Sequence, residues 1–427
     1  MVEAKILKNN IQLVCEKIPA ARTCAIGFYF STGSRYEDSD SRGVSHFTEH
    51  MLFKGTKKRT AKEISVFFDS MGAVLNAFTE REEVCLYSIV PAFENNISDA
   101  LELLCDMSEN CVFPEEEFIK EKKVVQSEIS SLQDDAEESA LDEVAAFVWK
   151  DSTLGQTIGG SVEEVEKITR NKLFSWYEKY FVHGELAVFV TGNFDENEIT
   201  ARLEKCSLRT AAARTGQKHF TEKSPWHSGL LFKKAAFSQN QIYALFPFDV
   251  DLEERESYAL SVLNTICGDC VSSRLFDAIR EKEGLCYNVF SYFTIYENAG
   301  VWCANLSADK KNVLKVVEML LKELSSFIKN PFTEKEVETG KNHIIGEEMI
   351  SAMDSEYVMR RNEKNFRLNI PLKNSSEIID LIKSITCEEI NRLASKIFDS
   401  GRRALVFYGS ALSGRMKRTI NLQNTSL

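Results

Sequence analysis

The sequence predicts an α+β fold built from two homologous domains. With 427 residues, 44% hydrophobic and 27% charged, the chain is longer than one hydrophobic core usually supports. Strand-like and helix-like apolar patterns occur in both halves in the same order, and a segment of small and polar residues separates the halves. We therefore expect an N-terminal domain at 1–208, a linker at 209–226 and a C-terminal domain at 227–427.

A long internal repeat supports the duplication. In the first half, a strand pattern at 83–91 is followed by two helical patterns that meet at 113–114. In the second half, a strand pattern at 300–309 is followed by two helical patterns that meet at 332–333. A repeat of about two hundred residues is too long for a solenoid unit, so it indicates duplicated domains of strand and helix layers.

Individual elements follow from local patterns. Residues 1–20 carry charges every few positions and indicate a first strand, not a secretory signal. The segment 43–53 has helical periodicity, and 72–90 shows two strand patterns interrupted by polar residues. Pro114 followed by three glutamates predicts a helix start, and Gly284 predicts the end of a helix before a strand.

Composition excludes several classes of protein. Net charge is −12 and basic residues do not cluster with aromatic residues, so we expect no nucleic-acid partner. No segment has transmembrane length, so we expect no membrane partner. The 11 cysteines fit reduced thiols in a cytoplasmic protein better than a disulfide framework. The one C-x-x-C, at Cys267 and Cys270, lacks the second pair of a zinc site, and buried small side chains explain it better than redox chemistry.

The chemical signal is the pair His46 and His50, which takes two of the chain's 6 histidines. On a helix these side chains lie one turn apart on one face and can converge on one metal ion. Imidazole suits zinc, and Glu49 beside that face could take a proton from a zinc-bound water. Partly buried, hydrogen-bonded histidines are the alternative, but the spacing with the intervening glutamate favours a single zinc site.

A third ligand is expected on the helix after Pro114. Glu121 and Glu128 fall on its apolar stripe, where a buried carboxylate would need a metal, a partner charge or hydrogen bonds. Glu128 is our third ligand, and Glu121 is expected beside it in a supporting position. The residues alone leave open a rotated stripe with both acids in solvent. The stripe consists of Phe118, Val125, Ile129 and Leu132.

Two regions of the sequence are candidates for substrate contacts. A peptide could pair with a strand in 72–90 if that strand lies at a sheet edge, although Asn76 alone is typical of a turn. Arg280 and Tyr287 flank the helix end at Gly284 and could point at one place. A solvated arginine and a half-buried tyrosine are the plainer interpretation.

Here the sequence resembles a known family. "HFTEH" followed by "EKKVVQSEI" is similar to the inverted-zincin metallopeptidases of the pitrilysin and insulin-degrading-enzyme clan (M16), especially the bacterial and mitochondrial-processing-peptidase branch. The likeness covers nearly the whole chain through "STGSRYED", "HMLFKGT", "MGAVLNAFTERE", "LGQTIGG", "VTGNFD" and "SSRLFDAIREKEGLCYNVFSYF". In place of the glycine-rich loop of the non-catalytic mitochondrial partner, this chain has "CGDCVSS", so it resembles the catalytic type.

The resemblance implies roles for the residues already singled out. It makes His46, His50 and Glu128 the ligands of one zinc ion, Glu49 the general base and Glu121 the second acid of the site. It also implies that Asn76, Ala77 and Phe78 form the edge that holds the substrate main chain. Arg280 and Tyr287 would grip the substrate, with Tyr287 supporting the oxyanion.

The expected function is therefore a cytoplasmic zinc metalloendopeptidase acting on short or unfolded peptides in a chamber between the two domains. The resemblance also implies a homodimer. A non-catalytic structural or binding relative is the alternative from another class, and a metal hydrolase with a non-peptide substrate is a second enzyme alternative. Manganese or cobalt suits the same ligands as zinc.

Overall fold

The computed structural model describes residues 2–93, 95–208, 219–286 and 288–426. It divides into two compact units, each assembled from three stretches of chain. Unit 1 comprises Met1–Leu132, Gln156–Gln217 and Ile350–Asn374, and unit 2 comprises Gln133–Gly155, Lys218–Met349 and Ser375–Leu427. Each domain expected from the sequence, 1–208 and 227–427, is one continuous stretch of chain. In the structure, 133–155 belongs to unit 2 and 350–374 belongs to unit 1. Most of the expected linker, 209–218, lies outside the described residues.

Unit 1 contains a six-stranded sheet in which only β2 and β6 run parallel. Strand β4 pairs with β5 alone, so it forms one edge of the sheet. The chain start, expected as one strand, forms two, because Asn10 turns the chain with φ 65° between them. In spatial order the strands are β1 (Val2–Ile6), β2 (Gln12–Lys17), β6 (Leu186–Gly192), β3 (Thr23–Phe30), β5 (Val84–Pro91) and β4 (Val74–Thr79).

Unit 2 repeats this arrangement with five strands. Its one parallel pair, β7 with β11, occupies the place of β2 and β6, and the predicted strands at 83–91 and 300–309 become the equivalent strands β5 and β10. The two halves therefore share one topology. In spatial order the strands are β7 (Gly229–Lys234), β11 (Ala404–Gly409), β8 (Gln239–Phe248), β10 (Gly300–Asp309) and β9 (Val289–Ile295).

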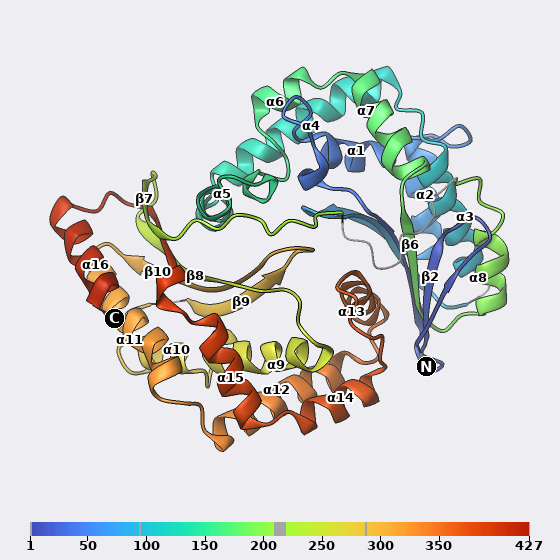
Figure 1. Ribbon diagram of the computed structural model, residues 1–427. Coiled ribbons are helices and arrows are strands. Elements are labelled where there is room, and N and C mark those ends of the chain that lie inside the picture. Colours follow the sequence, from blue (N-terminus) through green and yellow to red (C-terminus); the bar gives the residue numbers. More distant parts are fainter. Residues whose placement is uncertain (1, 94, 209–218, 287, 427) are drawn as a thin grey trace. The chain divides into compact units, whose positions relative to one another are not determined.

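The sheet of unit 1 is covered by helices on both faces because its side chains alternate between them. One face packs on helices from the N-terminal half: α1 (Val44–Leu52), α2 (Ala61–Met71), α3 (Asn96–Glu109), α4 (Glu115–Gln133), α6 (Val162–Lys167), α7 (Arg170–Tyr177) and α8 (Glu196–Leu203). The other face packs on α13 (Ser355–Arg367), a helix labelled in Figure 1. Its Met359 and Phe366 lie against Tyr29 and Phe189.

The sheet of unit 2 is likewise covered by a helix from the N-terminal half of the chain. Helix α5 (Ala136–Val148) packs on β8 and β11 through Val144 and Ala145. Asp135 and Asp354 begin α5 and α13 in the same way, each accepting two backbone N–H groups. Unit 2 also contains α9 (Glu254–Asn264), α10 (Arg274–Phe276), α11 (Val313–Lys329), α12 (Glu334–Ser351), α14 (Ser375–Ser384), α15 (Cys387–Ile397) and α16 (Gly414–Ser426).

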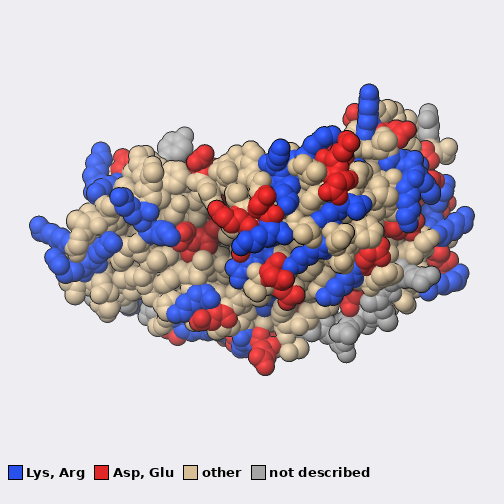
Figure 2. Space-filling view, turned by 90° about the horizontal axis from the view of Figure 1, so that it is seen from above, with Lys and Arg blue, Asp and Glu red and all other residues tan. Residues whose placement is uncertain are grey.

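Short 3-10 and π-helical turns complete the chain: η1 (Ser34–Tyr36), η2 (Thr153–Gly155), η3 (Glu178–Val182), η4 (Thr265–Asp269), η5 (Asp277–Glu281) and η6 (Ser400–Arg402). On the face displayed in Figure 2, acidic and basic side chains are interspersed. Across the described residues, no helix combines the length and apolar character needed to cross a bilayer.

Cysteine pairing departs from the sequence prediction. The structure joins Cys105 of α3 to Cys206, which follows α8, in a disulfide with a Cα–Cα distance of 6.3 Å. These residues meet because α8 packs along α3 and the backbone N–H of Ser207 donates to Glu109 at 2.6 Å. The prediction of reduced thiols is wrong for this pair, while the other nine cysteines are free, Cys267 and Cys270 among them.

Reduction should therefore destabilise unit 1. The disulfide closes a loop with a sequence separation of 101 residues, and releasing such a loop typically costs about 2–4 kcal/mol of unfolding free energy. We expect reductant to lower the thermal midpoint of wild type and of Cys270→Ser but not of Cys206→Ser. Eleven alkylatable thiols in non-reduced, denatured wild-type protein would contradict the pairing.

Candidate metal centre

The two histidines lie on α1, and a buried carboxylate fixes where this helix begins. Gly43 precedes the helix with φ 82°, a conformation that favours glycine. The two oxygens of Glu37 accept the backbone N–H groups of Gly43 and Ser45, both at 2.8 Å. Burial raises the pKa of Glu37 to about 7, against the lowering effect of these two hydrogen bonds. The carboxyl of "SRYED" thus sets the start of the helix that presents His46 and His50.

Close packing determines which face of α1 lies against the neighbouring chain. A Cβ on Gly43 would lie 2.4 Å from the carbonyl oxygen of Gly159, so the chain at 159–160 approaches the helix backbone closely. On the neighbouring helix α4, Phe118 stacks on Phe47 of α1 with ring centroids 5.2 Å apart. The "LGQTIGG" segment therefore belongs to the support of the histidine helix.

Helix α4 carries both candidate acids toward the histidines. Phe118, Glu121, Val125 and Ile129 are buried, as the stripe predicted. Leu132 is 44% exposed, so its assignment to the stripe is wrong, because the stripe ends one turn earlier. Glu121 is 6% exposed, and Glu128 is partly exposed with its carboxylate directed at both histidines. The alternative with both acids turned to solvent does not match this geometry.

His46, His50 and Glu128 form one cluster of potential metal ligands. The Nε2 atoms of His46 and His50 are 3.2 Å apart. Glu128 places Oε1 3.6 Å from Nε2 of His46 and Oε2 3.3 Å from Nε2 of His50. One ligand atom from each residue lies within 4.8 Å of the others. Two imidazole nitrogens and one carboxylate are a donor set that suits zinc, so the residues present fit this metal.

Protonation differs between the two histidines. Burial, aided by the nearby His50, lowers the pKa of His46 to about 4, so His46 is neutral near pH 7, as a metal ligand must be. Burial also acts to lower the pKa of His50, but the hydrogen bond to Glu121 and the charges of Glu49 and Glu128 outweigh it and raise that pKa. The acids around His50 thus favour its protonated form.

Glu49 lies beside the ligands and is held by the edge strand. The hydroxyl of Thr79, the last residue of β4, donates to Glu49 Oε2 at 2.6 Å. Burial raises the pKa of Glu49, and the Thr79 bond opposes this shift. A carboxylate poised to accept a proton needs a raised pKa, so the environment suits a general base.

Glu121 supports the cluster from behind. Its Oε1 is 2.9 Å from Nδ1 of His50 and its Oε2 is 2.7 Å from Nζ of Lys54. Burial acts to raise the pKa of Glu121, but these two partners lower it below its ordinary value. Glu121 is therefore an anion between two donors, the arrangement that orients a metal-binding imidazole.

The predicted substrate segment lies on the edge strand β4. Asn76 is an extended strand residue, not a turn residue; its Oδ1 accepts the N–H of Ala77 at 2.9 Å, and its Nδ2 is 3.4 Å from Tyr87 Oη. Phe78 packs against Tyr87 and Tyr29. Val74 and Asn76 are exposed.

The predicted residues of the C-terminal half are placed differently. Arg280 belongs to η5 in unit 2, where its guanidinium stacks 4.7 Å from the ring of Phe276. Tyr287 lies outside the described residues. The structure therefore joins His46, His50, Glu128, Glu49 and Glu121 in one site, with β4 alongside.

Three supporting residues escaped the sequence analysis. Lys54 follows His50 by four positions, so continued helical spacing could have indicated it. Thr79 and Glu37 carry no local signal, because their partners lie on other elements.

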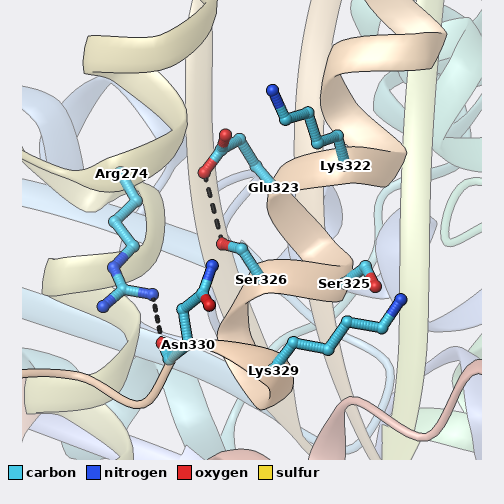
Figure 3. A pocket seen from close by; sticks show the side chains of 7 residues that line it. All are labelled: Arg274, Lys322, Glu323, Ser325, Ser326, Lys329 and Asn330. Carbon is cyan, nitrogen blue, oxygen red and sulfur yellow. Dashed lines mark hydrogen bonds between the residues drawn. The ribbon is translucent and has the colours of Figure 1, made fainter.

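A separate pocket of about 410 Å³ lies in unit 2 (Figure 3). Its lining includes Lys322, Lys329 and Arg274. The arginine donates to Glu336 at 2.6 Å and to the Asn330 carbonyl at 2.8 Å, so its charge is already compensated. This pocket shares no residue with the candidate metal centre.

Comparison with known proteins identifies similar sequences. Residues 12–161 match the family described as "Insulinase (Peptidase family M16)", and residues 167–344 match "Peptidase M16 inactive domain". An uncharacterized zinc protease of Bacillus subtilis, YmxG, is 32% identical over 400 residues, which cover 93% of this chain and 96% of that protein. An uncharacterized zinc protease of Rickettsia felis is 32% identical over 405 residues, covering 92% of this chain and 94% of that protein.

Solved structures share the fold at lower identity. An M16 inactive-domain protein of Pseudomonas fluorescens superposes with a TM-score of 0.87 at 18% identity, covering 96% of this chain and 99% of that one. A protease of Helicobacter pylori superposes with a TM-score of 0.80 at 19% identity, covering 96% of this chain and 99% of that one. A chain of the Candida albicans complex III2 superposes with a TM-score of 0.81 at 20% identity, covering 99% of this chain and 100% of that one. At these identities, the likeness shows the fold alone.

The Glu37 cap predicts a pH dependence of stability. The pKa of Glu37 is about 7 in the folded chain and near its ordinary value of 4.5 when unfolded, so the folded state binds the extra proton between these values. Protonation of Glu37 therefore contributes fully to the free energy of unfolding below pH 4.5. This contribution, about 3 kcal/mol, is lost as the pH rises through 7.

Chemical denaturation of metal-free protein tests this change. Glu37→Gln cannot ionise, so wild type should lose unfolding free energy relative to this variant between pH 5 and pH 8. Glu3→Gln, at an exposed position of β1, should keep the wild-type profile. Parallel pH profiles for wild type and Glu37→Gln would show that the cap does not titrate in this range.

Proposed function

Because the chain belongs to the M16 peptidase family, we propose that it is a zinc metalloendopeptidase that hydrolyses short or unfolded peptides. The single observation that carries this proposal is the convergence of His46, His50 and Glu128, with Glu49 beside them. Such a set of two imidazoles, one ligating carboxylate and one further carboxylate is the equipment of a metal-assisted hydrolase.

The proposed ligands of one zinc ion per chain are His46, His50 and Glu128. When bound, zinc supplies a Lewis acid that polarises a carbonyl and acidifies water. His46 offers a neutral imidazole near pH 7, because its pKa is about 4. His50 is oriented through Nδ1 by Glu121, which leaves its Nε2 facing Nε2 of His46 and the Glu128 carboxylate.

Glu49 is the proposed general base. Burial raises its pKa, and the Thr79 hydroxyl occupies Oε2, so Oε1 is the oxygen available to take a proton from the attacking water. The same carboxyl then returns a proton to the leaving amine. These two transfers use one side chain, whose position is set by the last residue of β4.

The edge position of β4 supports peptides as the substrate. An edge strand presents unpaired backbone groups, and an extended peptide can add to it as a further strand. Pairing of this kind needs an extended chain, so it favours short or unfolded substrates over folded proteins. Asn76, Ala77 and Phe78 are the proposed contacts. Roles for Arg280 and Tyr287 in gripping the substrate stay predictions from the sequence resemblance.

The Glu49→Gln variant tests the function. We expect wild-type protein loaded with zinc to cleave members of a mixture of unstructured peptides, and the variant to lose this turnover while keeping its zinc content and thermal midpoint. Mass spectrometry of the products identifies the cleaved bonds. A disulfide-bonded, folded protein in the same assay should remain intact until it is reduced and unfolded.

Cleavage retained by Glu49→Gln would remove this residue from the mechanism. Zinc-loaded wild type that cleaves nothing would favour the non-catalytic alternative.

Substitution of Thr79 tests how the base is held. A hydrogen bond to a charged group is worth about 1.5–3 kcal/mol, so Thr79→Val should lower kcat at least roughly 10-fold with a smaller effect on KM. Thr79→Ser keeps the hydroxyl and should retain most of the wild-type kcat. Steady-state kinetics with one fluorogenic peptide measure both parameters, and equal kcat values for Thr79→Val and wild type would contradict this role.

A further inference from the structure

Lys54 continues the line of the two histidines along α1. His46, His50 and Lys54 are spaced four residues apart, and the N–H of Lys54 still bonds to the carbonyl of Met51 at 3.1 Å just after the helix ends. The lysine side chain is 25% exposed, and its ammonium lies 2.7 Å from Glu121 Oε2. Its direction is toward the metal centre.

The Glu121 carboxylate is held from both ends. One oxygen is 2.9 Å from His50 Nδ1 and the other meets the Lys54 ammonium, so rotation of the carboxylate would break both contacts. Glu121 is 6% exposed, and a buried carboxylate that loses a partner carries the full cost of its desolvation. Both contacts are therefore needed to keep this side chain in place.

This support is concentrated on one histidine. Nδ1 of His46 is buried and makes no hydrogen bond to any residue that the structure describes. Among the same residues, Glu121 is the group that fixes the ring of a candidate ligand through its second nitrogen. The hydrogen bond that orients a ligand through its second nitrogen is thus made by His50, and it depends on Glu121.

We propose that Lys54 is a positioning residue of the metal centre: it fixes Glu121, which orients His50 for metal binding. This inference rests on the proposed zinc site and adds a residue outside the ligand motif. Lys54 touches no candidate ligand directly, so its effect passes through Glu121 alone.

Zinc affinity, measured by competition with a chromophoric chelator, tests the proposal without reference to peptidase activity. Loss of an outer partner of a ligating histidine typically weakens metal binding 10–100-fold, so we expect Lys54→Met to weaken zinc binding roughly 10-fold. Lys54→Arg keeps a cationic donor and should recover most of the affinity. Lys57→Met, the same change at an exposed lysine three residues away, should match wild type.

A double-mutant cycle separates positioning from a general structural effect. In the Glu121→Gln background, Lys54→Met should cause little further loss of zinc affinity, because the route through Glu121 is already broken. Additive losses would overturn the proposal, as would equal affinities of wild type and Lys54→Met. Should Lys54→Met not fold, Lys54→Gln replaces it in both comparisons. Wild type that binds no zinc would overturn the metal site itself, a result distinct from failure of the Lys54 role.

Discussion

The placement of helix α1 is the constraint on which the site depends. Two imidazoles one turn apart converge only if the helix starts at the right residue and presents the right face. Glu37 sets the start by accepting two N–H groups, and the close approach of Gly159 to Gly43 sets the side. The stacked pair Phe47 and Phe118 then ties α1 to the helix that carries both acids. A shift of one residue at the start would turn each histidine by about 100°.

The negative charge of three glutamates close to the two histidines determines the electrostatics of the metal-free site. Glu49, Glu121 and Glu128 all act on His50 and raise its pKa, although burial alone would lower it. Among the residues that the structure describes, the Glu121 carboxylate alone of these three has a further cationic partner, Lys54. Glu49 and Glu128 share the space in front of the histidines without a lysine or arginine ion pair among the described residues. A divalent cation is the natural complement of that excess negative charge, which agrees with the donor set.

Sequence patterns predicted the parts of the site that depend on one element. The His46–His50 pair could be predicted because its spacing requires only a helix. Glu121 and Glu128 could be proposed from the apolar periodicity of α4, but that periodicity alone did not decide whether Glu128 faces the histidines. Thr79, 30 residues from Glu49, and the Lys54–Glu121 pair depend on packing between elements, which periodicity does not encode. For the same reason the duplication was predictable but the exchange of α5 and α13 was not. Their apolar faces do not specify which sheet they cover.

The duplicated helices differ at the position of Glu121. Eight residues past the phenylalanine of each helical break, the first half has Glu121 and the second has Gly340. A Cβ on Gly340 would lie 2.5 Å from Ile266, so α12 packs directly on the segment that follows α9. In unit 2 a close apolar contact thus lies where unit 1 has the Glu121 carboxylate. Close packing and a buried ionic site are alternative ways to join the same two helices, because a buried charge needs partners that an apolar contact does not.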